Sequence, residues 1–200
     1  MLKHLPNTLT LARLFLAPII AWAVWQTNRP GGDDSAHVWA VAAAVLFVVA
    51  ALTDLFDGMA ARAFDADSKF GRMIDPIADK ALVGLPLIAL ACGFYLRGMS
   101  YWLPVAVSVA VIVGRDLVMT YVRLSATDGE GPKVSKLAKW KTALELIVVG
   151  AGVLFPLIPK VPGDQVLTGN LTLTLLVWMA LLVIAAGLSA YTAVRYFIAR

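Results

Sequence analysis

Cysteine, histidine and charged residues are all scarce in this chain of 200 residues. The single cysteine, Cys92, excludes an intrachain disulfide, and its place in an apolar run favours a small buried side chain over a reactive one. The two histidines, His4 and His37, lie far from the main group of acidic residues, so a nucleophilic triad has no support. Hydrophobic residues make up 60% of the chain, charged residues only 15%, and the mean hydropathy is +0.80. This composition excludes a soluble domain with one core and indicates a polytopic membrane protein.

Six apolar segments are long enough to cross a bilayer, which takes about 17–25 helical residues. They cover residues 8–26, 37–62, 72–96, 101–124, 140–158 and 170–196. Gly-, Pro- and Asp-rich turns separate most of them, and no internal repeat is visible. The sequence therefore predicts an all-α polytopic membrane protein with six transmembrane helices, organised as a single domain over residues 1–200.

Lysine and arginine are distributed unevenly between the two sides of such a bundle. One side holds only Arg29, Arg97 and Lys160, and nearly all the other basic residues fall on the opposite side. Because positive residues accumulate in cytoplasmic loops, we expect both termini in the cytoplasm and the chain in the cell (inner) membrane. The N-terminal segment has no small-residue cleavage pattern, so we expect it to be retained.

Four aspartates, Asp54, Asp57, Asp75 and Asp79, lie at the predicted cytoplasmic ends of the second and third spans. A charged residue at membrane depth costs about 2.5–3.5 kcal/mol on insertion scales and is a functional-site hypothesis by default. The spacing of three residues in the first pair and four in the second places each pair on one helical face. Two such faces turned together form an all-oxygen site, which suits Mg²⁺, Mn²⁺ or Ca²⁺ and not Zn²⁺. Two divalent cations held there can act together on a phosphate.

Small residues and an arginine are interleaved with these carboxylates. Gly58 and Gly71 each cost about 1 kcal/mol relative to alanine within a helix, which suggests that something packs closely against the backbone. Ala61 extends this small-residue face, and Arg62 offers a fork of donors for a phosphate. The alternative is a buried network in which nearby cations simply pair with the aspartates, and it does not account for the glycine spacing. Those cations would be Arg62, Arg72 and Lys80.

This stretch resembles, without a gap, the signature of the CDP-alcohol phosphotransferase family. The matching residues are Asp54-x-x-Asp57-Gly58-x-x-Ala61-Arg62 and, eight residues later, Gly71-x-x-x-Asp75-x-x-x-Asp79. The six-span layout extends the resemblance over essentially the whole chain. Enzymes of that family transfer a phosphatidyl-type group from a CDP-linked lipid to an alcohol and release CMP.

The resemblance implies a role for each matching residue. The four aspartates would bind two divalent cations, Mg²⁺ or Mn²⁺, and Asp79 would also be the general base for the acceptor hydroxyl. Gly58, Ala61 and Gly71 would leave room for the cytidine, and Arg62 would hold the pyrophosphate. The resemblance also implies CDP-diacylglycerol as the donor, a homodimer, and no nucleic-acid partner.

The opening of the first span, PNTLTLAR over residues 6–13, resembles the corresponding segment of phosphatidylglycerophosphate synthases and cardiolipin synthases of this family. From the residues alone, a second interpretation is equally good. Asn7 or Thr8 would cap the helix, and Arg13 would reach to the membrane interface.

A second basic group combines the segment SKLAKWKT, residues 135–142, with arginines of the fourth span. Arg115 lies well inside that span and needs a buried partner. Asp116 points away by about 100° and is expected to be a poor one. Arg123, eight residues on, shares roughly the same face and can converge with Arg115 on one anion. We therefore expect a phosphate pocket for a phosphorylated acceptor, formed by Arg115, Arg123, Lys136, Lys139 and Lys141. The alternative is an electrostatic anchor to anionic lipid, worth about 1 kcal/mol per basic residue, and both roles can coexist.

The choice of acceptor follows from the same group. The segment resembles the G-K-x-K-T element of phosphatidylglycerophosphate synthases, with Ala138 in place of the glycine, and Arg-Asp replaces an expected Arg-Glu in the fourth span. The resemblance implies glycerol 3-phosphate as acceptor, because a free small alcohol would not need so many cations. Cardiolipin synthase-type and phosphatidylinositol-phosphate synthase-type activities are the alternatives within the family.

Two alternatives come from other classes of protein. An ion or proton transporter would show glycine-interrupted spans in pseudo-symmetric halves, and these are missing. A scaffold or receptor with a calcium-stabilised core would need neither the arginine near the carboxylates nor the basic pocket.

Overall fold

The computed structural model describes residues 5–31, 35–64, 69–125, 136–157, 166–168 and 171–198. Within these ranges it describes the backbone alone for residues 5–9, 54–64, 69–73, 123–124, 136–139, 166–168 and 171. The described part contains six long helices: α1 Leu5–Asn28, α2 Ala36–Phe64, α3 Lys69–Leu96, α4 Trp102–Ser125, α5 Lys136–Leu154 and α6 Leu173–Ile198. The predicted all-α membrane fold is therefore confirmed, and each predicted span falls on one of these helices.

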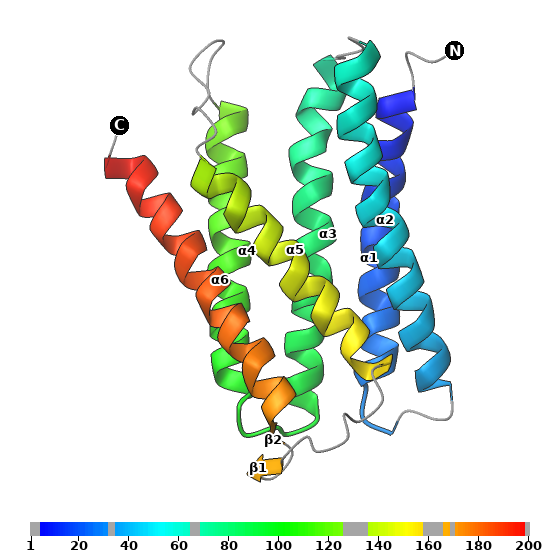
Figure 1. The fold of residues 1–200 in the computed structure, drawn as a ribbon, viewed down its shortest axis with the longest axis vertical. Helices are drawn as coiled ribbons and strands as arrows, with labels where there is room; N and C mark the ends of the chain where they lie inside the picture. The colour runs from blue at the N-terminus through cyan, green and yellow to red at the C-terminus, as the bar shows by residue number, and fades with distance from the viewer. Residues whose placement is uncertain are drawn as a thin grey trace.

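The helices run alternately up and down, so that the chain starts and ends at the same end of the bundle (Figure 1). The last turns of α2 and α4 and the first turns of α3 and α5 lie at that end too. We call it the terminal end. The opposite end carries the α1–α2 and α3–α4 connections and the segment that precedes α6.

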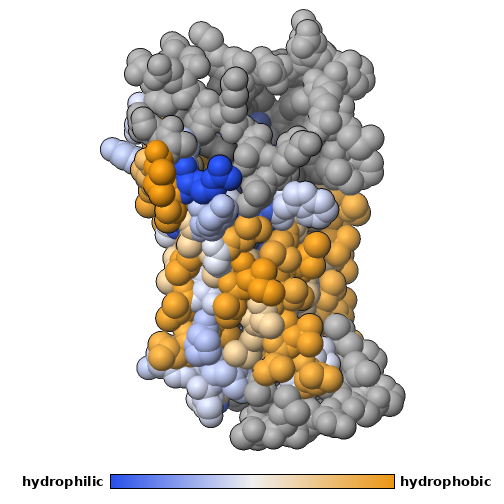
Figure 2. All heavy atoms as spheres, turned by 60° about the vertical axis from the view of Figure 1, so that its left-hand side comes forward, coloured by the Kyte–Doolittle hydropathy of each residue, from blue (hydrophilic) through white to orange (hydrophobic). Residues whose placement is uncertain are grey.

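Each helix contains a stretch that is long and apolar enough to cross a membrane. These stretches are Thr10–Asn28, Ala36–Thr53, Ile74–Leu96, Trp102–Val122, Trp140–Leu157 and Leu173–Ile198. Many large apolar side chains point outward, including Phe15 at 68% and Ile184 at 57% exposure. On the face that Figure 2 shows, hydrophobic residues cover most of the middle of the molecule. An outer surface of this kind is stable in lipid and not in water.

Cys92 is exposed on α3, so the expectation of a buried side chain was wrong. In a bilayer, an apolar side chain loses little by facing outward, because lipid tails are as apolar as the protein interior.

The structure adds short elements that the sequence did not predict. A turn of 3₁₀-helix, η2 Phe155–Leu157, follows α5. Two short antiparallel strands, β1 Val166–Thr168 and β2 Leu171–Thr172, precede α6. The hydroxyl of Thr172 accepts a hydrogen bond from the backbone N–H of Leu175 at 3.3 Å and so caps the start of α6.

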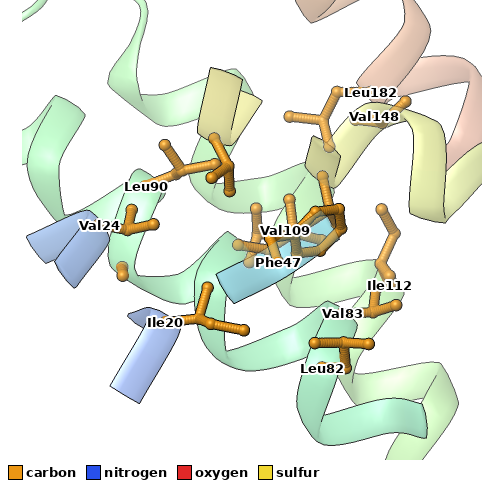
Figure 3. Packing of buried hydrophobic residues seen from close by; sticks show 14 of the residues in the cluster. Ile20, Val24, Phe47, Leu82, Val83, Leu90, Val109, Ile112, Val148 and Leu182 are labelled. Atoms are coloured by element: carbon orange, nitrogen blue, oxygen red, sulfur yellow. The ribbon is translucent and has the colours of Figure 1, made fainter. Parts of the chain in front are cut away.

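The interior is filled by apolar residues from all six helices, and α3 is the central one, since it packs against α1, α4 and α5. Figure 3 shows side chains of this cluster, among them Ile20, Phe47, Leu82, Val109 and Leu182. The indole N–H of Trp178 on α6 donates to the carbonyl of Val148 on α5 at 2.9 Å. This packing fixes α3, which carries the polar residues described next.

Gly93 and Arg97 hold the end of α1 against α3, at the end of the bundle opposite the termini. A methyl group on Gly93 would lie 2.6 Å from the Cβ of Asn28, so the Asn28 side chain packs directly on the backbone of α3. Arg97 donates from Nε to the carbonyl of Asn28 at 2.9 Å and from a terminal nitrogen to that of Thr27 at 3.0 Å. These bonds satisfy carbonyls that the end of a helix leaves without partners.

Candidate functional site

The first polar group of the site lies where α1 crosses α3. Asp75 and Asp79 stand one turn apart on α3, and we call them the acidic pair. The hydroxyl of Thr10 on α1 donates to Asp75 Oδ1 at 2.5 Å, and Arg13 donates to Asp79 Oδ1 at 3.1 Å. Thr10 and Arg13 are three residues apart, so one face of α1 meets one face of α3.

Arg13 is buried, with only 2% of its side chain exposed, whereas 45% of the Asp79 side chain is exposed. The interpretation of Arg13 as an interfacial side chain was therefore wrong, because its guanidinium lies inside the bundle as a partner for Asp79. A charged group that deep requires such a partner. Asp79 stays partly accessible although it is paired with Arg13.

The acidic pair fits the hard divalent cations expected there. It offers carboxylate oxygens one turn apart on one helical face, which are the donors that Mg²⁺ and Mn²⁺ prefer. The described side chains contain no group of three or more acidic, histidine or cysteine residues, and those of Asp54 and Asp57 are not among them. The two-metal arrangement stays a prediction for those two aspartates.

A second polar group lies around Asp116 on α4, and we call it the Asp116 cluster. Asp116 Oδ1 lies 2.9 Å from a terminal nitrogen of Arg115 and 2.5 Å from Lys141 Nζ on α5. Asp116 Oδ2 lies 2.9 Å from Lys80 Nζ on α3. Lys141 also pairs with Glu145 at 2.9 Å. With each group counted in its ordinary ionisation state, three cations and two carboxylates leave one net positive charge.

The expectation that Asp116 would be a poor partner for Arg115 was wrong. Their Cα–Cβ bonds do diverge, but the long arginine side chain swings round far enough to reach its neighbour. Its other terminal nitrogen donates to the hydroxyl of Thr192 on α6 at 3.1 Å. Arg115 thus connects α4 to α6.

The pairing of Lys80 bears on the simple ion-pair alternative for the aspartates. Lys80 pairs with Asp116 on α4, at 2.9 Å, and this pair does not involve Asp75 or Asp79. The side chains of Arg62 and Arg72 are outside the described part, so their pairing is untested.

The remaining predicted site residues are placed by their backbone only. Eight of them lie at the terminal end, on the last turns of α2 and α4 and the first turns of α3 and α5 (Figure 1). They are Asp57, Gly58, Ala61, Arg62, Gly71, Arg123, Lys136 and Lys139. Asp54 lies one turn earlier on α2. Their proposed roles remain predictions.

Thr10, Arg13, Lys80, Asp116 and Glu145 take part in the site, although none was predicted as a binding residue. Glu145 carried a signal in the sequence, since an acidic residue inside a span, four residues after a lysine, predicts an ion pair on one helical face. The pairing of Arg13 with Asp79 carried no such local signal, because 66 residues separate the two.

Comparison of the sequence with known proteins assigns this chain to a family. Residues 3–191 match the family described as CDP-alcohol phosphatidyltransferase. The protein of Cereibacter sphaeroides named CDP-diacylglycerol–glycerol-3-phosphate 3-phosphatidyltransferase is 39% identical over 146 residues, which cover 72% of this chain and 61% of that protein.

Two further bacterial proteins with the same name are also similar in sequence to this chain. The one from Bacillus subtilis is 39% identical over 153 residues, covering 74% of this chain and 75% of that protein. The one from Rickettsia felis is 32% identical over 195 residues, covering 98% and 94%. The chain belongs to the CDP-alcohol phosphatidyltransferase family.

Proposed function

We propose that this protein transfers the phosphatidyl group of CDP-diacylglycerol to glycerol 3-phosphate, giving phosphatidylglycerophosphate and CMP. The observation that carries the proposal is that two consecutive residues of α3, Asp79 and Lys80, belong to the acidic pair and to the Asp116 cluster, respectively. Asp79 faces α1 and is partly open, and Lys80 reaches α4 and the positively charged Asp116 cluster. A hydroxyl and a phosphate of one small molecule can therefore be bound side by side. The names of the related proteins support the same donor and acceptor.

In this mechanism, Asp79 takes the proton of the acceptor hydroxyl. The hydroxyl oxygen forms a bond to the lipid-side phosphorus of CDP-diacylglycerol, and the bond from that phosphorus to the CMP oxygen breaks. CMP leaves with the electron pair. Arg13 holds Asp79 through Oδ1, which fixes the orientation of the carboxylate toward the acceptor hydroxyl.

We propose that Asp54, Asp57, Asp75 and Asp79 together hold two divalent cations, Mg²⁺ or Mn²⁺. When bound, these cations neutralise the negative charge that develops on the pyrophosphate. Gly58, Ala61 and Gly71 leave room for the cytidine, and Arg62 holds the pyrophosphate. The acceptor phosphate is bound by Arg115, Arg123, Lys136 and Lys139, and Lys141, which is enclosed by Asp116 and Glu145, contributes positive charge from behind them.

The position of the site fits a substrate that arrives from the membrane. The polar groups lie toward one end of the bundle, where CDP-diacylglycerol can enter from the bilayer and glycerol 3-phosphate from water. We propose that this end faces the cytoplasm, in the inner membrane of the cell, and that the protein acts as a homodimer, as the family resemblance implies.

The test is release of CMP by the purified chain in detergent from CDP-diacylglycerol and glycerol 3-phosphate. We expect release that depends on Mg²⁺ or Mn²⁺, stops on chelation and returns when the metal is restored. An ion or proton transporter would release none. Absence of metal-dependent CMP release with every alcohol tried would refute the proposal.

A further inference from the structure

Asp116 holds three cations from three different helices. Lys80 of α3, Arg115 of α4 and Lys141 of α5 each place a nitrogen within 3 Å of one of its oxygens, at 2.9, 2.9 and 2.5 Å. Three cations this close together repel one another strongly unless an anion lies between them. The carboxylate of Asp116 is therefore what keeps them together.

Burial divides the Asp116 cluster into two layers. In the inner layer, 1% of the Lys141 side chain and none of the Glu145 side chain is exposed. Lys141 is already enclosed by two carboxylates there. In the outer layer, 21% of the Lys80 side chain and 12% of the Arg115 side chain is exposed, and these are the cations that a solute can reach.

The outer layer lies next to the acidic pair. Lys80 follows Asp79 directly on α3 and diverges from it by about 100° around the helix. Asp79 is engaged by α1 and Lys80 by α4, so the carboxylate and the ammonium group are fixed in different directions from one stretch of backbone. The hydroxyl and the phosphate of one acceptor can therefore be bound by neighbouring residues of α3.

We propose that Asp116 is a positioning residue that holds Lys80 and Arg115 together as the clamp for the acceptor's phosphate. Lys80 is the clamp residue nearest to Asp79, and the Lys141–Glu145 pair supports Asp116 from the interior. This inference rests on the proposed function and assigns to Lys80 a binding role beyond the pocket residues given there.

The test measures steady-state kinetics of the purified full-length chain, varying glycerol 3-phosphate and CDP-diacylglycerol separately. In Asp116→Asn and in Lys80→Gln, we expect the KM for glycerol 3-phosphate to rise about tenfold or more, since a charge-assisted contact is lost. The KM for CDP-diacylglycerol should change less than about twofold on the same scale. Asp116→Glu keeps the charge and should recover most of the loss.

A second readout needs no turnover. Glycerol 3-phosphate alone should raise the melting temperature of the wild type, because a ligand that binds only the folded state stabilises it. It should have a much smaller effect on Asp116→Asn and Lys80→Gln. Arg97→Ala is the control for simple destabilisation, since Arg97 binds α1 carbonyls at the other end of the bundle. It should lower the melting temperature and leave the KM for glycerol 3-phosphate unchanged.

Equal rises of the two KM values in Asp116→Asn, or an unchanged KM for glycerol 3-phosphate in Lys80→Gln, would overturn the inference. If Asp116→Asn does not fold, Lys80→Gln and Asp116→Glu decide alone, through the same KM ratio. A wild type that makes no phosphatidylglycerophosphate refutes the proposed function. A wild type that makes it while both variants keep the normal KM refutes only the clamp.

Discussion

At the residue scale, Asp79 gives the most direct test of the proposed chemistry. Its carboxylate pairs with buried Arg13, and its side chain is still partly exposed. Asp79→Asn keeps the shape but removes the proton acceptor, and a general base contributes about 10²–10⁴-fold to a rate. We expect CMP release to fall by at least about 10²-fold while membrane insertion stays normal. Because buried Arg13 loses an ionised partner, the melting temperature in detergent should fall as well, so activity is compared for the fraction that elutes as a single species. Near-full activity of a well-folded Asp79→Asn would remove Asp79 from the mechanism.

Lys141 illustrates how burial changes a prediction made from sequence. Sequence alone treats it as one more cation of an open pocket, but it is enclosed by Asp116 and Glu145. Removing one partner of a buried ion pair costs about 3–5 kcal/mol, because the other charge is left uncompensated. We therefore expect Lys141→Met to lower the melting temperature in detergent as well as to weaken acceptor binding.

The matched control for Lys141 is the double variant Lys141→Met with Glu145→Gln. It removes one charge of each sign, and it should be more stable than Lys141→Met alone. Unchanged stability of the single variant would show that Lys141 is not buried among charges as described.

At the scale of helices, the packing of α1 on α3 sets the position of Arg13 against Asp79. Gly93 allows this packing, since an added Cβ would lie 2.6 Å from the Cβ of Asn28. Gly93→Ala should force the helices apart and destabilise the protein by about 1–3 kcal/mol, the usual cost of overpacking. Thermal unfolding in detergent measures the effect.

Gly187 on α6 is the control for that substitution, because an added Cβ there meets nothing within 4 Å. Gly187→Ala should be neutral or stabilising, by up to about 1 kcal/mol from helix propensity. Equal losses in both variants would mean that glycine flexibility matters and that the contact with Asn28 does not.

The elements show which parts of the structure a sequence can predict. Long apolar runs identified all six helices, because in lipid each span must form its backbone hydrogen bonds within the helix. The β1–β2 pair was missed, since its strands have three and two residues and lie in a Pro- and Gly-rich segment. The spacing of four residues within a helix predicted that Asp75 and Asp79 share one face. Spacing could not predict the contact of Arg13 with Asp79, or of Lys80 with Asp116, since those contacts depend on how separate helices pack.

At the scale of the whole molecule, the uneven distribution of basic residues predicts which end faces the cytoplasm. Both chain ends lie at the terminal end of the bundle (Figure 1). With Cys92→Ala as background, Ser100→Cys and Ser125→Cys provide exposed probes near opposite ends. A membrane-impermeant maleimide should label Ser100→Cys in intact cells and Ser125→Cys only after lysis. The reverse pattern would place the site on the other side of the membrane.

The central claim is that the acidic pair on α3 and the Asp116 cluster, which Lys80 of α3 joins, together select a phosphorylated acceptor for a phosphatidyl group. The most direct measurement offers the purified chain CDP-diacylglycerol, Mg²⁺ or Mn²⁺ and one acceptor at a time, and identifies the lipid product by chromatography. The acceptors are glycerol 3-phosphate, glycerol, phosphatidylglycerol, inositol and inositol phosphate. We predict phosphatidylglycerophosphate from glycerol 3-phosphate and little product from unphosphorylated glycerol or inositol. Efficient transfer to an unphosphorylated alcohol, with none to glycerol 3-phosphate, would contradict the account.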